Sequence, residues 1–278
     1  SSGAYAVELE EIIVTANKRA ESLQDVAMSV TALDGSKIEE AGLNSLTELS
    51  AYVPNLTVTE NAVNTIIGMR GVGIGANQSF EQSVGVYVDG VHYGKSRQVR
   101  TGLFDLQQVE VLRGPQGILF GKNTLAGAIN VTSASPTVGG EFEGKVSLNK
   151  ESHGGETVEV SLQGSLSDTF ALRLAYKDRK DDGYMTNSMT SGATFVGEPL
   201  PAAFSSNAPI TDESMWRLSA LWEPNDSTSV ELKHASSDHL RIGGTAVLTT
   251  FAPQANIPGS NALMYGTMGA VYPGFAGQ

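Results

Sequence analysis

The chain has 278 residues, with 30 acidic and 18 basic side chains and a formal net charge of −12. This acidic balance, without a basic block, argues against nucleic acid as the main partner. The absence of cysteine excludes disulfides and thiol chemistry, and no run approaches the roughly 18 apolar residues of a membrane-spanning helix. Charged residues make up only 17% of the chain, against a usual value of about 25%. Glycine occupies 31 of the 278 positions, about 11%, where about 7% is usual. This composition favours extended β-structure.

Residues 1–24 form an N-terminal segment with one short apolar run. Ala4-Tyr5-Ala6 either ends a signal peptide, since it has the small-x-small form of a cleavage site, or matches that form by coincidence. Residues 11–16 (EIIVTA) read as a short strand that has no partner at hairpin distance. Such a strand either packs on its own domain or pairs with the sheet edge of another protein.

Residues 25–136 predict one small α+β domain. Strands are expected at 26–33, 65–70, 84–88, 109–113 and 128–132. Capping-box patterns at 36–39 and 45–48 predict two short helices. Asp89-Gly90, between two apolar runs, predicts a hairpin turn that needs no further role.

A glycine-rich motif in this domain resembles a nucleotide site only superficially. Residues 71–76 fit the pattern G-x-G-x-x-A, and Asp89 follows at about the expected distance. That motif requires a helix whose N-terminus receives the pyrophosphate. Residues 77–83 are polar and lead into another strand, so we expect tight turns here rather than dinucleotide binding.

Three sequence blocks, 66–73 (IIGMRGVG), 85–91 (GVYVDGV) and 109–131 (VEVLRGPQGILFGKNTLAGAINV), closely resemble the plug domain of TonB-dependent outer-membrane transporters. The resemblance implies that residues 11–16 are the TonB box, which pairs with the energy-coupling protein TonB in the periplasm. The implied TonB-binding residues are Glu11, Ile12, Ile13, Val14, Thr15 and Ala16. The plug signature comprises Arg70, Gly71, Asp89, Gly90, Arg113, Gly114, Pro115, Gly121, Asn123 and Gly127.

Two signature arginines, Arg70 and Arg113, each stand at a strand end before glycine. A plug enclosed by a barrel would leave them little water, so they would need carboxylate partners. The resemblance implies partners on the barrel wall. The alternative is that both are surface residues beside loops.

Residues 137–278 alternate apolar and polar side chains in short runs around 142–148, 158–166, 170–176, 216–222 and 230–232. This period of two predicts strands with one apolar face, in either a soluble sandwich or a transmembrane barrel. Short connections near 167–169 and 224–226 alternate with longer ones, and this alternation favours an outer-membrane barrel. The charged cluster at 177–182 is expected to be a solvated outer rim, with contact to lipopolysaccharide or substrate as the alternative.

The sequence shows no catalytic constellation, cofactor motif or metal site, so we do not expect an enzyme. His234 and His239 are five residues apart and would point to opposite faces of a strand, which makes a poor metal pair.

The predicted architecture is an α+β plug followed by the first antiparallel strands of a transmembrane β-barrel. It divides into an N-terminal segment (1–24), the plug (25–136) and the barrel part (137–278). A complete plugged barrel has about 22 strands, and five are predicted here. We therefore expect a truncated chain, about a third of a receptor of roughly 760 residues by extrapolation from strand number.

The resemblance implies active uptake of a scarce substrate, driven by the inner-membrane proton-motive force through TonB. The receptor would lie in the outer membrane of a Gram-negative bacterium, with lipid and lipopolysaccharide around the barrel, the plug in its lumen and a periplasmic N-terminus. An iron–siderophore complex or similar metal chelate is the first expectation. A saccharide, cobalamin or an aromatic compound is the alternative, and a secreted soluble β-rich binding module is the rival class. Candidate ligand contacts are Gln78, Phe80, Tyr93 and Arg97.

Overall fold

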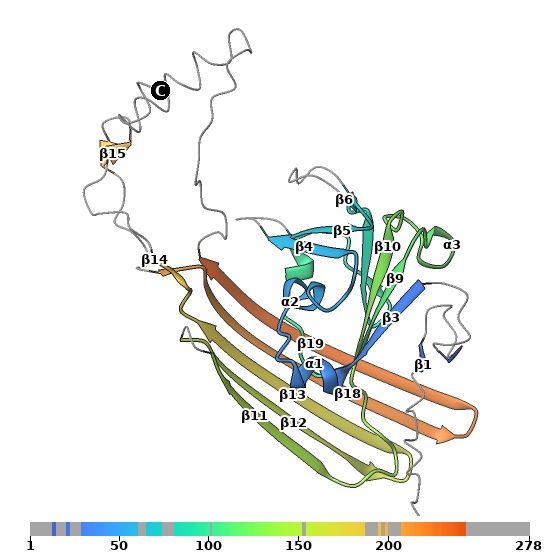
Figure 1. Cartoon of the computed structure of the whole chain (residues 1–278). Helices are drawn as coiled ribbons and strands as arrows, with labels where there is room; N and C mark the ends of the chain where they lie inside the picture. Colours follow the sequence, from blue (N-terminus) through green and yellow to red (C-terminus); the bar gives the residue numbers. More distant parts are fainter. Residues whose placement is uncertain are drawn as a thin grey trace, which may run out of the picture.

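Two β-sheets of different character dominate the computed structural model (Figure 1). It describes residues 13–14, 21–22, 29–60, 65–73, 81–100, 102–151, 154–186, 194–195, 198–199 and 207–242. We call residues 29–133 the plug. Residues 143–242 carry five long strands, which we call the wall.

The plug is built on a five-stranded sheet of order β3-β9-β10-β7-β8. Its strands are β3 (Ser29–Asp34), β7 (Val84–Val88), β8 (Val91–His92), β9 (Leu106–Arg113) and β10 (Gly127–Ser133). A smaller sheet holds β4 (Leu56–Glu60), β5 (Thr65–Met69) and β6 (Val72–Gly73). The helices are α1 (Gly35–Glu40), α2 (Leu46–Ser50), the 3-10 turn η1 (Gln98–Arg100) and α3 (Gly117–Phe120). N-terminal to the plug, β1 (Ile13–Val14) pairs with β2 (Glu21–Ser22).

Apolar side chains of both sheets and of α1 and α2 meet in one core. Leu49, Ile67, Val84, Val109 and Ile129 are fully buried there. Each predicted strand of residues 25–136 is present within a few residues of its expected bounds. The sheet is mixed, because β7 and β10 run parallel while the other pairs are antiparallel.

The capping patterns behave differently in the two helices. Ser45 caps α2 as predicted, since its side chain accepts a hydrogen bond from the Glu48 amide. The Ser36 cap is wrong: the N-cap lies two residues earlier, at Asp34, and Asp34 Oδ1 accepts the Ser36 amide at 2.7 Å. The Asp34 carboxylate, directly before the first helical residue, takes the capping role in place of the Ser36 hydroxyl.

Strand β4 was not predicted, although Leu56 and Val58 are buried between exposed threonines. Its five residues follow directly on the turn after α2, and their pattern becomes visible only through pairing with β5. In the glycine motif, β6 folds back on β5 with Met69 opposite Val72. A dinucleotide-binding motif needs a helix that begins among these glycines, and residues 72–73 form a strand there instead.

The wall is a continuous antiparallel sheet of order β11-β12-β13-β18-β19. Its strands are β11 (Glu143–Lys150), β12 (Glu156–Ser167), β13 (Phe170–Asp181), β18 (Ile210–Asn225) and β19 (Thr228–Ile242). Tight turns follow β12 and β18 at one end, while the longer segment 182–209 joins β13 to β18 at the other. That segment contains the two-residue strands β14 (Met185–Thr186), β15 (Thr194–Phe195), β16 (Glu198–Pro199) and β17 (Asn207–Ala208). The two predicted tight turns at one end are thus confirmed, whereas at the opposite end β13 and β18 have a long connection and residues 151–155 join β11 to β12.

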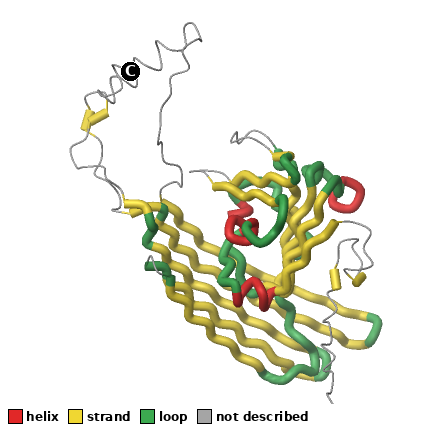
Figure 2. Tube along the Cα trace, in the orientation of Figure 1, coloured by secondary structure: helices red, strands yellow, loops and turns green. Residues whose placement is uncertain are grey.

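The wall strands curve around one side of the plug, which lies on their concave face (Figure 2). Strands β13, β18 and β19 are longer than their runs of alternating apolar and polar residues, and the additional residues are mostly polar. In the part of the chain that the structure describes, no helix has the length and apolar character needed to cross a membrane.

Candidate functional site

The interface between plug and wall is a set of ionic and hydrogen-bonded contacts in which the wall supplies the cations. Lys145 meets Glu39 at 2.6 Å, Arg179 meets Glu48 at 3.6 Å, and Lys233 meets Asp89 at 3.4 Å. Further pairs are Arg173–Asp105, Arg217–Asp105 and Arg241–Glu60. The acids belong to the plug in every one of these pairs, so the contact surface is complementary in charge.

Lys177 of β13 is the most deeply buried of these cations, with 1% of its side chain exposed. Its Nζ contacts Glu159 Oε1 on the neighbouring strand at 2.6 Å. It also donates to Asn44 Oδ1 at 2.7 Å and to the Leu103 carbonyl at 2.9 Å. One ammonium therefore joins two wall strands and two plug loops, and all three of its protons have an acceptor.

Asp105, between η1 and β9, is held by two guanidinium groups. Arg173 Nε lies 3.0 and 3.2 Å from its carboxylate oxygens, and Arg173 Nη2 also donates to Oδ1. Arg217 Nη1 donates to the Asp105 carbonyl at 3.1 Å and lies 3.7 Å from Oδ2, while its guanidinium stacks 4.5 Å above the Phe104 ring. Only 6% of the Asp105 side chain is exposed, so this pairing is strong and water-poor.

The expectation that the charged cluster 177–182 forms a solvated rim is wrong for its inward members. Lys177 and Arg179 are buried against the plug, whereas Lys180 faces outward and is exposed. Alternation along β13 decides the outcome, because successive side chains of a strand point to opposite faces. The same rule places the two histidines: His239 pairs inward with Glu213, and His234 packs outward on Trp216. Their predicted opposite orientation is confirmed.

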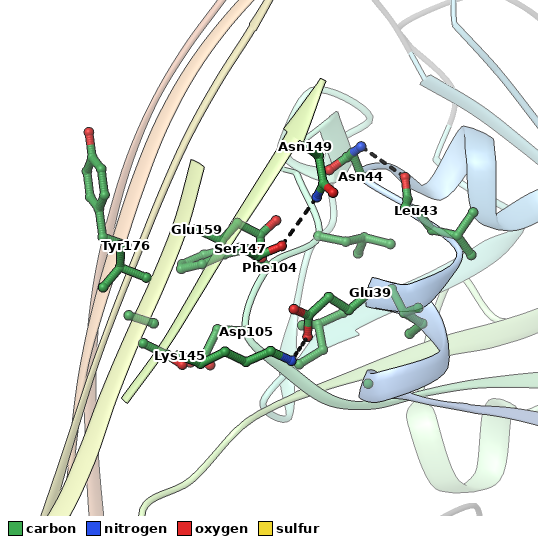
Figure 3. Close-up of a pocket in the computed structure, with 18 of the residues that line it drawn as sticks. Glu39, Leu43, Asn44, Phe104, Asp105, Lys145, Ser147, Asn149, Glu159 and Tyr176 are labelled. Atoms are coloured by element: carbon green, nitrogen blue, oxygen red, sulfur yellow. Dashed lines mark hydrogen bonds and ion pairs between the residues drawn. The ribbon is translucent and has the colours of Figure 1, made fainter. Parts of the chain in front are cut away.

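A cavity of about 120 Å³ lies in this interface, between α1 with its following loop and the strands β11–β13. Figure 3 shows Glu39 and Lys145 pointing toward each other at one side of it, with Ser147 and Asn149 on the wall and Asn44 on the plug. Polar and apolar atoms contribute about equally to its lining. A space of this size has room for a few water molecules, and beside it Phe104 of the plug packs on Ala175 and Met215 of the wall in a small buried apolar cluster.

Of the predicted TonB box, the structure describes Ile13 and Val14. Val14 is fully buried and belongs to a cluster with Tyr87, Leu112 and Ala128, whereas Ile13 is 46% exposed. The other members, Glu11, Ile12, Thr15 and Ala16, lie outside the described residues. Burial raises the pKa of the Tyr87 phenol, whose hydroxyl donates to the Phe120 carbonyl. In this conformation Val14 is packed against the plug sheet.

Arg70 and Arg113 lie side by side on the plug. Burial and the nearby Arg70 charge together lower the pKa of the Arg113 guanidinium. Arg113 donates to the Pro54 carbonyl, to Ser29 Oγ and to Thr31 Oγ1, all within the plug. Neither arginine forms an ion pair with the described part of the wall, so their expected carboxylate partners remain a prediction.

The signature residues cluster at turns with unusual backbone angles. Positive φ angles occur at Arg70-Gly71, Asp89-Gly90, Gly114, Gly121 and Asn123, and the 89–90 hairpin is confirmed. Asp89 does more than turn the chain, because its carboxylate accepts from the Ser133 amide and hydroxyl at 2.9 and 2.7 Å and meets Lys233. Gly127 permits a close approach: a Cβ there would clash with Met69 Sδ and with the Leu112 carbonyl oxygen. Pro115 follows Gly114 at the end of β9.

The candidate ligand contacts are not brought together. Gln78 and Phe80 lie outside the described residues. Tyr93 is half-buried against the plug core and lines a cavity shared with Arg217 and Ala235 of the wall, while Arg97 is exposed. Their assignment to ligand stays a prediction.

Sequence reasoning missed Asp105, Arg173, Lys177 and Arg217 as interface residues. A signal was present, since basic residues recur at odd positions of β13 (173, 177 and 179) while apolar residues occupy its even positions up to 176. The partners could not be paired, because they are separated by 68 to 133 residues in sequence.

A sequence model of the TonB-dependent Receptor Plug Domain family matches residues 22–128. The chain is 33% identical to the "Pesticin receptor" of Yersinia pestis over 193 residues, which cover 67% of this chain and 28% of the relative. The chain belongs to the TonB-dependent outer-membrane receptors. Another relative in this family, "Vitamin B12 transporter BtuB" of Vibrio vulnificus, is 27% identical over 218 residues, covering 77% of this chain and 35% of that protein.

Solved receptor structures have the same fold. The crystal structure of the ferric yersiniabactin uptake receptor FyuA from Yersinia pestis superposes with a TM-score of 0.62 at 25% identity, covering 76% of this chain and 31% of that one. The pyoverdine receptor FpvA from Pseudomonas aeruginosa gives 0.66 at 17% identity, covering 84% and 31%. The chain thus spans about a third of the length of these receptors, and it matches them through plug and wall together.

Proposed function

We propose that this chain supplies the plug and first barrel strands of an outer-membrane receptor that takes up a ferric siderophore or similar metal chelate with energy from TonB. We assign residues 1–24 to the TonB-binding segment, 25–136 to the plug and 137–278 to the barrel. The named relatives support this proposal, because they include a ferric yersiniabactin uptake receptor and a pyoverdine receptor. They are transport receptors and not enzymes.

The proposed membrane location rests on the orientation of the wall side chains, which is the reverse of the orientation in a soluble sheet. The charged residues that are buried in the wall strands β13 and β18, namely Lys177, Arg179, Glu213 and Arg217, face the plug, while the large apolar residues of the wall face away and are exposed. The exposed set comprises Val146, Leu148, Val158, Leu162, Leu166, Leu174, Tyr176, Trp216, Leu218, Trp222, Val230, Leu232 and Leu240. A soluble sandwich would bury this face, and a monomeric soluble protein rarely exposes so large a patch. Lipid around a barrel accounts for it.

Aromatic residues bracket the apolar band at both ends. Tyr176 pairs with Trp216 toward one end, and Phe170 pairs with Trp222 toward the tight turns. The two pairs are about 20 Å apart along the strands, at roughly 3.4 Å per residue. Such paired rings are typical of the interfacial girdles of outer-membrane barrels, and the tight turns would then be periplasmic.

Coupling to TonB would begin at the N-terminal segment. β1 lies toward the end of the wall that carries the tight turns (Figure 1), which is the periplasmic end in this proposal. Because Val14 is buried, it must leave the plug surface before TonB can pair with the segment that contains it. Substrate at Gln78, Phe80, Tyr93 and Arg97 would favour that release, so outer binding and inner exposure would be coupled in free energy.

The test is uptake by the complete receptor in a strain without other ferric-siderophore receptors, using radioiron complexes of yersiniabactin and pyoverdine as probes. Deletion of residues 11–16 should abolish uptake and leave surface binding intact. Uptake that survives the deletion would refute the TonB-box assignment.

Cobalamin is the second candidate, because several relatives are named vitamin B12 transporters. Labelled cyanocobalamin serves as its probe in the same strain. Transport of cyanocobalamin, with no uptake of either iron complex, would replace the siderophore proposal.

A further inference from the structure

The contacts between plug and wall are unevenly distributed along the plug sequence. Among the described residues, ion pairs to the wall involve Glu39, Glu48, Glu60, Asp89 and Asp105. In the segment from β1 to β3, the described residues (13–14, 21–22 and 29–34) form no ion pair with the wall. Its side chains pack on the plug itself, as Val14 does on Tyr87 and Leu112.

β3 is also the edge strand of the plug sheet and pairs only with β9 there. A force on the N-terminus therefore acts first on elements whose described residues have no ion pair to the wall. The next strand, β9, begins at residue 106, directly after Asp105. Along the chain the ion pairs to the wall begin at Glu39, and Asp105 is the one that lies next to β9, the sheet neighbour of β3.

Three independent features concentrate on Asp105. Arg173 and Arg217 hold its carboxylate from two wall strands. Its own carbonyl accepts the Ala134 amide at 2.9 Å, at the point where the chain leaves β10 toward the wall. Its φ of +50° is a left-handed value that aspartate tolerates better than most residues.

We infer that Asp105 is a positioning residue for transport: it holds β9 and β10 on the wall while TonB pulls the N-terminal segment. This inference rests on the proposed function. Without the anchor, the pull would displace the whole plug sheet and leave an open lumen. Removing one partner of a buried ion pair leaves the other charges uncompensated, so the substitution of Asp105 should populate the displaced state strongly.

The test is entry of vancomycin, an antibiotic too large for general porins, into cells that make the complete receptor. Asp105→Asn keeps the shape and the left-handed preference but removes the charge. We expect vancomycin susceptibility to rise roughly tenfold or more in cells with TonB, and to stay at the wild-type level in cells without TonB. A merely structural role would raise susceptibility equally in both strains.

Glu156→Gln is the matched control, because it breaks the exposed Lys150–Glu156 pair within the wall; it should leave susceptibility unchanged. If Asp105→Asn does not assemble into a heat-modifiable barrel, Arg173→Gln and Arg217→Gln replace it, since each leaves one guanidinium on Asp105.

Unchanged susceptibility in cells with TonB, an equal rise with and without TonB, or failure of all three variants to assemble would each overturn the inference. Failure of the proposed function is recognised separately, as wild-type iron uptake that does not depend on TonB.

Discussion

Replacing Lys177 by methionine tests whether buried polar contacts hold the plug on the wall. The substitution preserves the length of the side chain and removes its charge. It leaves Glu159, 23% exposed, without its cation and deprives Asn44 Oδ1 and the Leu103 carbonyl of a donor. Losing one partner of a buried pair costs about 3–5 kcal/mol, and Lys177 is buried enough for this value to apply without a discount for solvent.

Hydrogen exchange measures the effect at two plug loops. The Leu103 amide donates to the Asn44 carbonyl at 2.8 Å, and the Leu43 amide donates to the Ile38 carbonyl at 3.0 Å. Local opening of these loops should become easier by about 3 kcal/mol, so their exchange in detergent-solubilised receptor should accelerate roughly 100-fold.

Lys180→Met is the matched control, because Lys180 lies on the same strand, faces outward and is exposed. It should change exchange little. The double variant Lys177→Met/Glu159→Gln should recover part of the protection, since it also removes the uncompensated carboxylate. Wild-type exchange at residues 43 and 103 in Lys177→Met would refute the reasoning.

Three further outcomes follow from the packing. Because the Tyr87 pKa is raised, the unfolded phenol ionises first; stability should fall as pH rises above about 10, and Tyr87→Phe should abolish that component of the pH profile in chemical unfolding. Gly127→Ala should destabilise the plug by about 1–3 kcal/mol, because its Cβ would clash with the Leu112 carbonyl oxygen of the neighbouring strand as well as with Met69 Sδ; an unchanged unfolding midpoint would contradict this. Leu218→Arg, on the exposed face, should cost about 2–4 kcal/mol in barrel folding into lipid vesicles, whereas Leu218→Ala should cost less; equal costs would argue against lipid on this face.

Local patterns sufficed wherever a residue's neighbours in sequence are also its neighbours in space. The cap at Ser45 and the hairpin at Asp89-Gly90 are of this kind, as is the period-two alternation of β12 and β13. The Ser36 cap failed because two local acceptors competed and Asp34 was the stronger. β4 failed because five residues carry little periodicity without their partner strand.

The candidate site was predictable only as motifs. Resemblance identified the plug signature, and the structure places most of it at turns. It could not show that Asp89 also meets Lys233, 144 residues away, or that Val14 is buried beneath Tyr87 and Leu112. Burial of a side chain is decided by the elements folded over it.

The sequence by itself determined the order of elements, the two-faced strands of the wall and the family resemblance. These depend on steric and hydrophobic preferences that repeat over two to four residues. Only the tertiary structure decided which face of the wall meets the plug and which charges are paired. The cluster at 177–182 is identical in sequence whether it is a solvated rim or a buried anchor. Its role depends on Asn44, Glu48 and Leu103, which reach Lys177 and Arg179 only when the plug lies against the wall.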